Sequence, residues 1–470
     1  MKADRYKSKV KFFGIVLCLA LACATGAVGQ PAKITKKDAK KAEQIARQAG
    51  AAFVKKDYRV ALDGYTQAAA LNAINPDYRF WKGAAHFYLN EYSLAIPELD
   101  GALSLGYKKP LDLYSIRWLS NFKEKNYDAA LADVKQGLVL DPNNLDLLQA
   151  LGDISYQKNN YREAVDAYQK VVLKNPNTAG DLHLNIAKAQ SSLGNVPAQI
   201  AAAQEAIKRR TLFVGDAYLI MADGYRKQRN FDASIEAYLK VITAKPDTYS
   251  AYENLADMYR DQNRFDEAIE ISRKALRVFP NDGQIYTNLS FFYSLADRNE
   301  DAIQAAQAGI RFLPDKYMAY TNLCRAYNDA KKHDMAIREC NNALKRNPKD
   351  GETYYYLARA YDLTGKGGEA TKYYKQAVTG MLEQTKNNPD APDGFYLLGN
   401  AYRADNQFEK AIAAYTKCLE LSPRYVRARY NLGIIQLRQK NKTAALEQYN
   451  RLRELDPELA GKLKVEIDKS

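Results

Sequence analysis

Residues 246–280 read PDTYSAYENLADMYRDQNRFDEAIEISRKALRVFP, and they hold one complete copy of a pattern that recurs along the chain. The stretch runs from one proline to the next, a step of 34 residues that other prolines repeat. Three runs keep this step: Pro142 and Pro176; Pro246, Pro280, Pro314 and Pro348; and Pro389, Pro423 and Pro457. Thr211 takes the proline's place midway between Pro176 and Pro246. A fixed period of this length indicates one supersecondary unit copied in tandem, so we expect function on a stacked surface rather than in one pocket.

Each unit can be numbered so that its final proline is position 32. In residues 249–280 the apolar positions are then 4, 7, 8, 11, 17, 20 and 27, occupied by Tyr252, Leu255, Ala256, Tyr259, Phe265, Ala268 and Ala275. Steps of three and four place the first four on one face of a helix and the others on one face of a second helix. The polar residues 262–264 lie between the two, and the closing proline cannot continue a helix. Each unit is therefore predicted to be a helix-turn-helix hairpin.

These positions resemble the tetratricopeptide repeat, whose family pattern has Leu-Gly and Tyr in the first helix, Ala and an aromatic residue in the second, and a closing proline. Two segments match most closely: Leu398, Gly399, Tyr402, Phe408, Ala411, Tyr415 and Pro423; and Leu151, Gly152, Tyr161, Ala164, Tyr168 and Pro176. The resemblance implies an all-α fold. We expect a right-handed α-solenoid of about 12 tandem hairpins with a short C-terminal helix.

The sequence divides into four segments by this interpretation. Residues 1–29 are predicted to be a signal peptide, 30–40 a basic leader, 41–457 the continuous repeat array, and 458–470 a C-terminal capping helix or tail. Two prolines, Pro76 and Pro110, come three residues later than the pattern requires. Before Pro389 the delay is seven residues. Seven residues are about two helical turns, so we expect a lengthened, protruding second helix near 381–389.

The N-terminus has a basic stretch followed by an apolar run from Phe12 to about Gly29, the order of a secretory signal peptide. Cleavage after Ala27-Val28-Gly29 would leave a mature chain that starts at Gln30. Two alternatives stay open, an uncleaved membrane anchor and a lipoprotein attached through Cys23. All three predict an exported protein that is periplasmic or associated with the cell envelope.

The charge balance bears on the partner. The full chain has a formal net charge of +14. Residues 1–29 contain five basic and one acidic side chain, so the mature chain would carry +10. In an exported protein this charge favours an acidic protein or peptide partner over nucleic acid. Membrane association is expected only through the N-terminus.

Three cysteines lie in the repeats: Cys324, Cys340 and Cys418, at positions 8, 24 and 27. Other repeats have small or apolar residues there, so plain packing is the favoured interpretation. A disulfide between Cys324 and Cys340 within one hairpin is also geometrically conceivable, and the sequence leaves the pairing open.

No pattern for catalysis is found. The three histidines occupy positions that hold Tyr or Phe in other repeats, and neither a phosphate-binding glycine loop nor a zinc-type His/Cys cluster occurs. We therefore expect no enzymatic activity, no cofactor and no metal.

The family resemblance places the binding surface on the first helices, whose positions 2, 5, 6, 9, 12 and 13 line a concave groove. Position 6 holds Asn254, Asn288 and Asn322 in successive repeats, and Asn185 and Asn431 elsewhere. A side-chain amide both donates and accepts, so a row of them can bind the main chain of an extended peptide. The row resembles the asparagine ladder of the O-linked N-acetylglucosamine transferases. Asparagine is, however, common at this position throughout the family, so a structural role is the competing interpretation.

Further groove candidates lie in the C-terminal repeats. Position 5 holds Tyr355, Tyr396 and Tyr430, and position 9 holds Arg325 and Arg359. Aromatic and guanidinium groups are enriched where binding energy concentrates.

The leading hypothesis is a non-catalytic scaffold of the cell envelope that binds an extended peptide or protein in its groove. Two alternatives remain: an assembly or secretion component that docks through its outer surface, and a carbohydrate-handling module.

Overall fold

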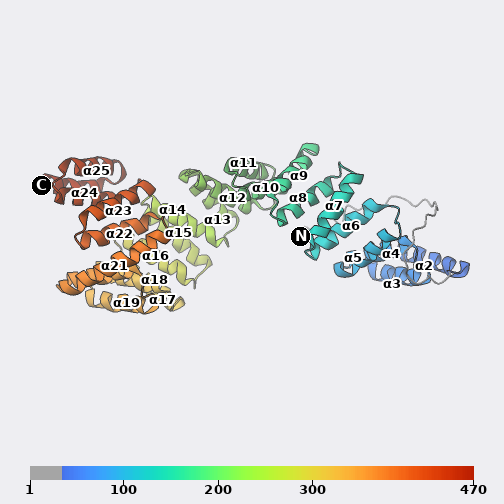
Figure 1. Ribbon diagram of the computed structural model, residues 1–470, viewed down its shortest axis with the longest axis horizontal. Coiled ribbons are helices and arrows are strands. Elements are labelled where there is room, and N and C mark those ends of the chain that lie inside the picture. Colours follow the sequence, from blue (N-terminus) through green and yellow to red (C-terminus); the bar gives the residue numbers. More distant parts are fainter. Residues whose placement is uncertain (1–33) are drawn as a thin grey trace. The chain divides into compact units, whose positions relative to one another are not determined.

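The computed structural model describes residues 34–470, and every regular element in this range is an α-helix (Figure 1). The predicted all-α array of tandem hairpins is confirmed, with 25 helices in the described part of the chain. The predicted signal peptide, the cleavage site and Cys23 lie outside the described residues. The chain divides into two compact units, with the division between Gln228 and Arg229 in the turn that follows α12. The sequence had predicted one continuous array.

Unit 1 comprises five helical hairpins followed by α12. Its helices are α2 (Lys36–Val54), α3 (Tyr58–Leu71), α4 (Pro76–Tyr88), α5 (Tyr92–Ser104), α6 (Pro110–Lys123), α7 (Tyr127–Leu140), α8 (Leu145–Gln157), α9 (Tyr161–Lys174), α10 (Gly180–Ser192), α11 (Val196–Lys208) and α12 (Val214–Lys227). The even-numbered helices are the first helices of their repeats.

Unit 2 begins with α13 and continues with six hairpins and a final single helix. Its helices are α13 (Phe231–Ala244), α14 (Tyr249–Asp261), α15 (Phe265–Val278), α16 (Gly283–Leu295), α17 (Asn299–Phe312), α18 (Tyr317–Asp329), α19 (His333–Arg346), α20 (Gly351–Leu363), α21 (Gly367–Asn387), α22 (Pro392–Ala404), α23 (Phe408–Leu421), α24 (Val426–Arg438), α25 (Lys442–Leu455) and α26 (Pro457–Lys469). The predicted C-terminal segment thus forms a helix.

The hairpins pack as the repeat positions predict. In α14 the side chains of Tyr252, Leu255, Ala256 and Tyr259 are buried, at positions 4, 7, 8 and 11. Small residues at position 8 allow close approach of the second helix. A Cβ atom added to Gly399 in α22 would lie 2.6 Å from the Tyr415 ring of α23, closer than packed carbon atoms come. The short distance between the two helices therefore favours a residue without a side chain at position 399.

The turns inside the hairpins share one backbone feature. Asn263, between α14 and α15, has a φ of 59°, and residues with φ between 56° and 77° occupy the corresponding turn in the other hairpins. A left-handed residue closes the first helix and lets the chain reverse within a few residues. This explains why the inter-helix segments are short and polar.

The prolines that come late have a different role from those on the regular step. Pro76 and Pro110 are the first residues of α4 and α6. At that position the missing N–H is not needed for a helical hydrogen bond. They therefore begin a repeat instead of ending one, and the boundaries of these repeats shift by a few residues.

The second helix of the long repeat is extended, as predicted from its late proline. Helix α21 has 21 residues, whereas the preceding second helix α19 has 14. The extension packs more than expected: Met381 and Thr385 on it are buried. Gly351 approaches closely enough that an added Cβ would lie 2.5 Å from the Met381 nitrogen. The first turn of the α21 extension is thus packed against the rest of unit 2 and does not protrude freely.

The array begins earlier than its expected start near Lys41. Helix α2 starts at Lys36, because Thr35 caps it: the Thr35 hydroxyl oxygen accepts a hydrogen bond from the Asp38 nitrogen at 3.1 Å. Part of the predicted basic leader therefore lies on the first helix.

Candidate peptide-binding surfaces

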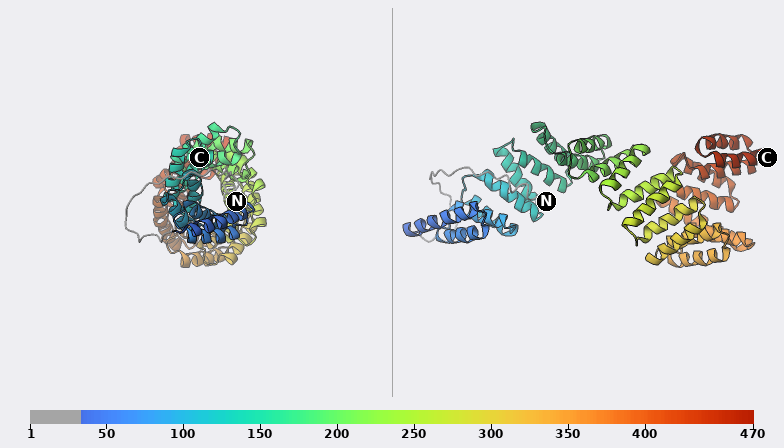
Figure 2. Two further views of the ribbon diagram at one scale, coloured as in Figure 1. Left: turned by 90° about the vertical axis from the view of Figure 1, so that its right-hand side faces the viewer. Right: turned by 180° about the vertical axis from the view of Figure 1, so that it is seen from behind.

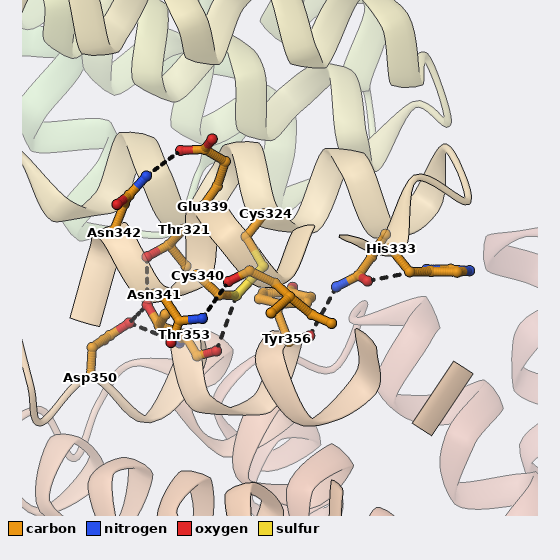
Figure 3. Close-up of a disulfide and its surroundings, with 12 residues drawn as sticks. Thr321, Cys324, His333, Glu339, Cys340, Asn341, Asn342, Asp350, Thr353 and Tyr356 are labelled. Carbon is orange, nitrogen blue, oxygen red and sulfur yellow. Dashed lines mark hydrogen bonds between the residues drawn. A yellow bond between two sulfur atoms is a disulfide. The ribbon is translucent and has the colours of Figure 1, made fainter. Parts of the chain in front are cut away.

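A disulfide joins the two helices of one hairpin in unit 2. Cys324 of α18 and Cys340 of α19 are bonded, with their Cα atoms 5.2 Å apart (Figure 3). This corrects the favoured interpretation of plain packing. Positions 8 and 24 face each other across a hairpin at the separation that a disulfide requires. Cys418 is a free thiol and is buried.

The same hairpin is tied to the next first helix, α20, by polar contacts. The hydroxyls of Thr321 and Thr353 are 2.6 Å apart. Asn328 donates from Nδ2 to the main-chain oxygen of Tyr356 at 2.9 Å. Figure 3 shows Thr321, Thr353 and Tyr356 around the disulfide. The disulfide thus fixes the position of Arg325, which follows Cys324 on α18. The hydrogen bond from Asn328 fixes that of Tyr356 on α20.

The three asparagines of the predicted ladder have different surroundings. Asn254 and Asn288 are partly buried, and the Asn288 side-chain oxygen accepts a hydrogen bond from Gln284 at 2.8 Å. Asn322 is only 8% exposed; its Nδ2 donates to the main-chain oxygen of Thr287 at 2.9 Å, and its oxygen accepts from Arg325. The amide of Asn322 therefore already links two repeats. Peptide binding by the ladder stays a prediction.

Arg325 lies among aromatic and acidic groups. Its guanidinium carbon is 4.5 Å from the centroid of the Phe291 ring and 5.2 Å from that of Tyr356. Its Nη2 atom is 3.7 Å from Oε1 of Glu352. Burial raises the pKa of Glu352 to about 7, and the charge of Arg325 opposes this rise only in part. Glu352 therefore titrates near neutral pH.

The other predicted residues of unit 2 are also partly engaged. Arg359 donates to Asp329 at 2.8 Å. Tyr355 packs against the Tyr374 ring with centroids 5.9 Å apart, and Tyr396 against Tyr425 at 5.0 Å. Tyr430 packs against the C-terminal core formed with α26. All three tyrosines are partly exposed, so they remain candidates for binding.

Unit 2 contains contacts between repeats that are far apart in sequence. Arg427 of α24 donates to the main-chain oxygen of Leu295 at the end of α16, at 2.7 Å. Asn263 donates to the main-chain oxygen of Arg424 at 3.1 Å. In Figure 2 the yellow-green helices of unit 2 lie alongside its red ones. These two hydrogen bonds therefore join the C-terminal repeats of unit 2 to its earlier repeats. The repeat pattern in the sequence gives no indication of such contacts.

Unit 1 contains two adjoining cavities on its first helices. One measures about 520 Å³ and lies between α6, α8 and α10; the other measures about 550 Å³ and extends to α12. They share Asp153, Asn185 and Lys188. We call the residues that line these two cavities the unit 1 groove. Asn185 is the position 6 residue of its repeat, so the family position does place it in a groove.

Three further polar residues of the unit 1 groove were not predicted from the sequence. Asp146, Asp181 and Asp216 line it and occupy position 2 of successive first helices. Aspartate in the first turn of a helix ordinarily indicates only a favourable start. The recurrence of aspartate at one groove position in successive repeats was the signal in the sequence that could have identified these residues.

No group of His, Cys, Asp and Glu side chains in residues 34–470 is arranged to hold a metal ion. No helix in the same range is long and apolar enough to cross a membrane.

Comparison with known families agrees with the architecture. Tetratricopeptide repeat signatures match residues 121–190, 221–283, 325–392 and 396–460, together more than half of the chain. The chain therefore belongs to the tetratricopeptide repeat family, whose members commonly bind protein or peptide partners.

Individual relatives are distant. A UDP-N-acetylglucosamine–peptide N-acetylglucosaminyltransferase of Giardia intestinalis is 30% identical over 82 residues, which are 17% of this chain and 6% of that protein. This chain thus matches only a small part of that enzyme's length. Among solved structures, the MamA protein is 27% identical, with a TM-score of 0.33 over 37% of this chain and 94% of MamA. Yeast Tom70 is 16% identical, with a TM-score of 0.40 over 91% and 96% of the two chains.

Proposed function

We propose that this protein is an exported, non-catalytic scaffold of the cell envelope that holds an extended segment of a partner protein against its first helices. The unit 1 groove carries this proposal, because its adjoining cavities of about 520 and 550 Å³ extend over successive repeats. An extended segment is the kind of ligand that contacts several repeats at once.

The disulfide supports the exported location. Disulfides persist in oxidising compartments such as the periplasm and are rare in the cytosol. Cys324 and Cys340 are both fully buried and bonded to each other. The location itself is tested by the intact mass of the protein purified from its own cells. A mass starting at Gln30 fits cleavage and excludes both lipid attachment at Cys23 and a retained anchor.

Site-specific photo-crosslinking in the producing cells tests the groove. A photoreactive amino acid replaces Gln149 or Tyr156 in the unit 1 groove, Tyr396 in unit 2, or the exposed Lys170 of α9 as a control. We expect Gln149 and Tyr156 to cross-link to one contiguous partner segment, identified by mass spectrometry, and Lys170 not to. Cross-links from Tyr396 would show that unit 2 binds a partner segment as well. Cross-links from Lys170 alone would contradict groove binding.

One observation favours the alternative of docking through the outer surface. Val139 of α7 and Leu173 of α9 occupy position 29 of consecutive repeats and are 73% and 78% exposed. Apolar side chains at one repeated position can form a docking strip. The change of both to Ser would abolish partner capture under this alternative and leave it intact under groove binding.

The acidic partner expected from the net charge has a separate basis. It rests on the net charge of +10 that the mature chain would carry, which describes the average surface. The groove itself has a different local charge.

A further inference from the structure

The unit 1 groove combines apolar side chains with carboxylates. Trp118, Leu119, Phe122 and Tyr156 line its first cavity, and Val171, Leu182, Leu184 and Phe213 line the second. An apolar lining of this kind favours burial of apolar side chains of a ligand.

The charges that line the groove are mostly negative. Four aspartates line it, against two lysines: Asp146, Asp153, Asp181 and Asp216, with Lys123 and Lys188. The groove is thus acidic within a chain whose formal net charge is +14. A cleft of one sign attracts ligands of the opposite sign more strongly than the average surface does.

The aspartates at position 2 extend beyond the cavities. Asp77 of α4 and Asp112 of α6 occupy the same position as Asp146, Asp181 and Asp216. Five successive first helices of unit 1 therefore have an aspartate in their first turn. In unit 2 this position is acidic in two first helices, with Glu352 and Asp393, and not acidic in four, with Ser250, Gln284, Met318 and Arg427. Those four helices form without an acidic residue there. Helix initiation alone does not require the acidic series.

The carboxylates also have internal contacts. Asp181 accepts hydrogen bonds from the Thr211 hydroxyl at 2.7 Å and the Leu212 nitrogen at 3.0 Å. Asp153 accepts from the Tyr168 hydroxyl at 2.7 Å, and Asp216 is 3.9 Å from the Lys188 nitrogen. The hydroxyl and the main-chain N–H that bind Asp181 are neutral donors, so they orient its carboxylate without cancelling its charge. Four carboxylates against two ammonium groups leave the lining of the groove with an excess of negative charge.

We infer that the unit 1 groove binds an extended segment in which basic side chains, Lys or Arg, alternate with apolar ones. Successive side chains of an extended chain point to opposite sides. Alternation therefore lets apolar side chains enter the cavities while basic side chains reach the aspartates. This inference rests on the proposed function and specifies the partner's chemistry.

The test measures fluorescence anisotropy of three labelled decapeptides with the mature chain at low and high salt. The peptides alternate Leu with Lys, Leu with Glu, and Leu with Ser. We expect the Leu-Lys peptide to bind most tightly and its affinity to fall as salt rises, because charge pairs at a protein surface are screened.

Two matched triple variants assign the binding to the groove. Asp146→Asn, Asp153→Asn and Asp216→Asn remove three groove charges; Asp63→Asn, Glu124→Gln and Asp166→Asn remove three exposed charges elsewhere in unit 1. Both triples change the net charge equally, and thermal melting followed by circular dichroism verifies that each is folded. We expect the groove triple to weaken Leu-Lys binding by at least about tenfold and the surface triple by less than about twofold.

The outcomes separate this inference from the proposed function. Equal effects of the two triples, or binding of the Leu-Glu peptide as tight as that of Leu-Lys, would overturn the cationic ligand. If the Leu-Ser or Leu-Glu peptide binds and Leu-Lys does not, groove binding survives and the inference fails. If none of the three binds, both are overturned for unit 1.

Discussion

Arg427, in the first turn of α24, donates a hydrogen bond to the main-chain oxygen of Leu295, which lies 132 positions earlier in the chain. The Arg427 guanidinium also lies 5.9 Å from the centroid of the Phe265 ring. In a solenoid each repeat ordinarily contacts only its neighbours. This pair therefore adds a long-range contact that the repeats do not need for their own packing.

Arg427→Ala should loosen unit 2 without unfolding its hairpins. The variant loses the bond to Leu295, so amide hydrogen exchange should become faster at the start of α24 and the end of α16, while α19 keeps its protection. Hydrogen exchange with mass spectrometry measures this. Arg438→Ala, at the exposed end of the same helix, is the control and should change nothing. Unchanged exchange in Arg427→Ala would show that the contact contributes no stability.

Reduction of the disulfide should destabilise unit 2. A cross-link that closes a loop of this length, with a sequence separation of 16, is worth about 3 kcal/mol through the unfolded chain. Urea unfolding with and without dithiothreitol measures the loss. A variant with Cys324→Ala and Cys340→Ala should be insensitive to the reductant. An equal response of this variant would assign the effect to another group.

Gly399→Ala should destabilise the protein, because the added Cβ would lie 2.6 Å from the buried ring of Tyr415. Overpacking of this kind costs about 1–3 kcal/mol. Gly461→Ala is the matched control, since Gly461 is also inside a helix, α26, and a Cβ added to it would meet no atom of a neighbouring element within 4 Å. It should be neutral or stabilising by up to about 1 kcal/mol. Urea midpoints compare the two, and equal effects would contradict the packing explanation.

Glu352 should make stability depend on pH near neutrality. Its folded pKa of about 7 lies above the ordinary value of 4.5, so between these values the folded chain binds a proton that the unfolded chain does not. Lowering the pH from 8 to 5.5 should therefore raise the free energy of unfolding through this group.

Glu352→Gln should remove that contribution. Urea unfolding at both pH values should show a smaller gain on acidification for this variant than for the wild type. Glu383→Gln, at an exposed position on α21, serves as the control. Identical pH responses of the wild type and Glu352→Gln would contradict the raised pKa.

Asn322→Ala should mainly lower the free energy of unfolding, and any effect on peptide binding should be secondary. The buried amide holds the Thr287 main chain and Arg325, and the loss of buried hydrogen bonds costs about 1–3 kcal/mol. Asn254→Ala, at a partly exposed position 6, should cost much less in the same urea titration. A fold-neutral Asn322→Ala that loses peptide binding would instead assign Asn322 to the groove.

The hairpins could be predicted because each repeat packs through residues close in sequence. Positions 4, 7, 8 and 11 of α14 are buried as the spacing required, and the seven-residue delay before Pro389 became two turns of α21. The contact of Arg427 with Leu295 could not be predicted, because it depends on the rotation between repeats summed over the several repeats that separate the two residues. Plain packing of Cys324 and Cys340 was favoured and the disulfide left open, because positions 8 and 24 hold small or apolar residues in other repeats; the bond between them corrects this.

The candidate site was predicted only in part. Family positions located Asn185 in the unit 1 groove, but Asp146 and Asp216 resemble ordinary helix starts in the sequence. Conversely, Asn322 matches a groove position and is occupied by internal hydrogen bonds. Sequence position indicates which face a residue occupies, whereas hydrogen bonding to neighbouring repeats decides whether it is available.

The disulfide also limits how far the chain can extend under mechanical force. When a solenoid is pulled from its ends, its repeats can open one after another and release their full contour length. The bond between Cys324 and Cys340, 16 residues apart, withholds about 50 Å of that length, at ~3.3–3.6 Å for each extended residue. A pulled molecule should therefore lengthen by this additional step only after the bond has been reduced.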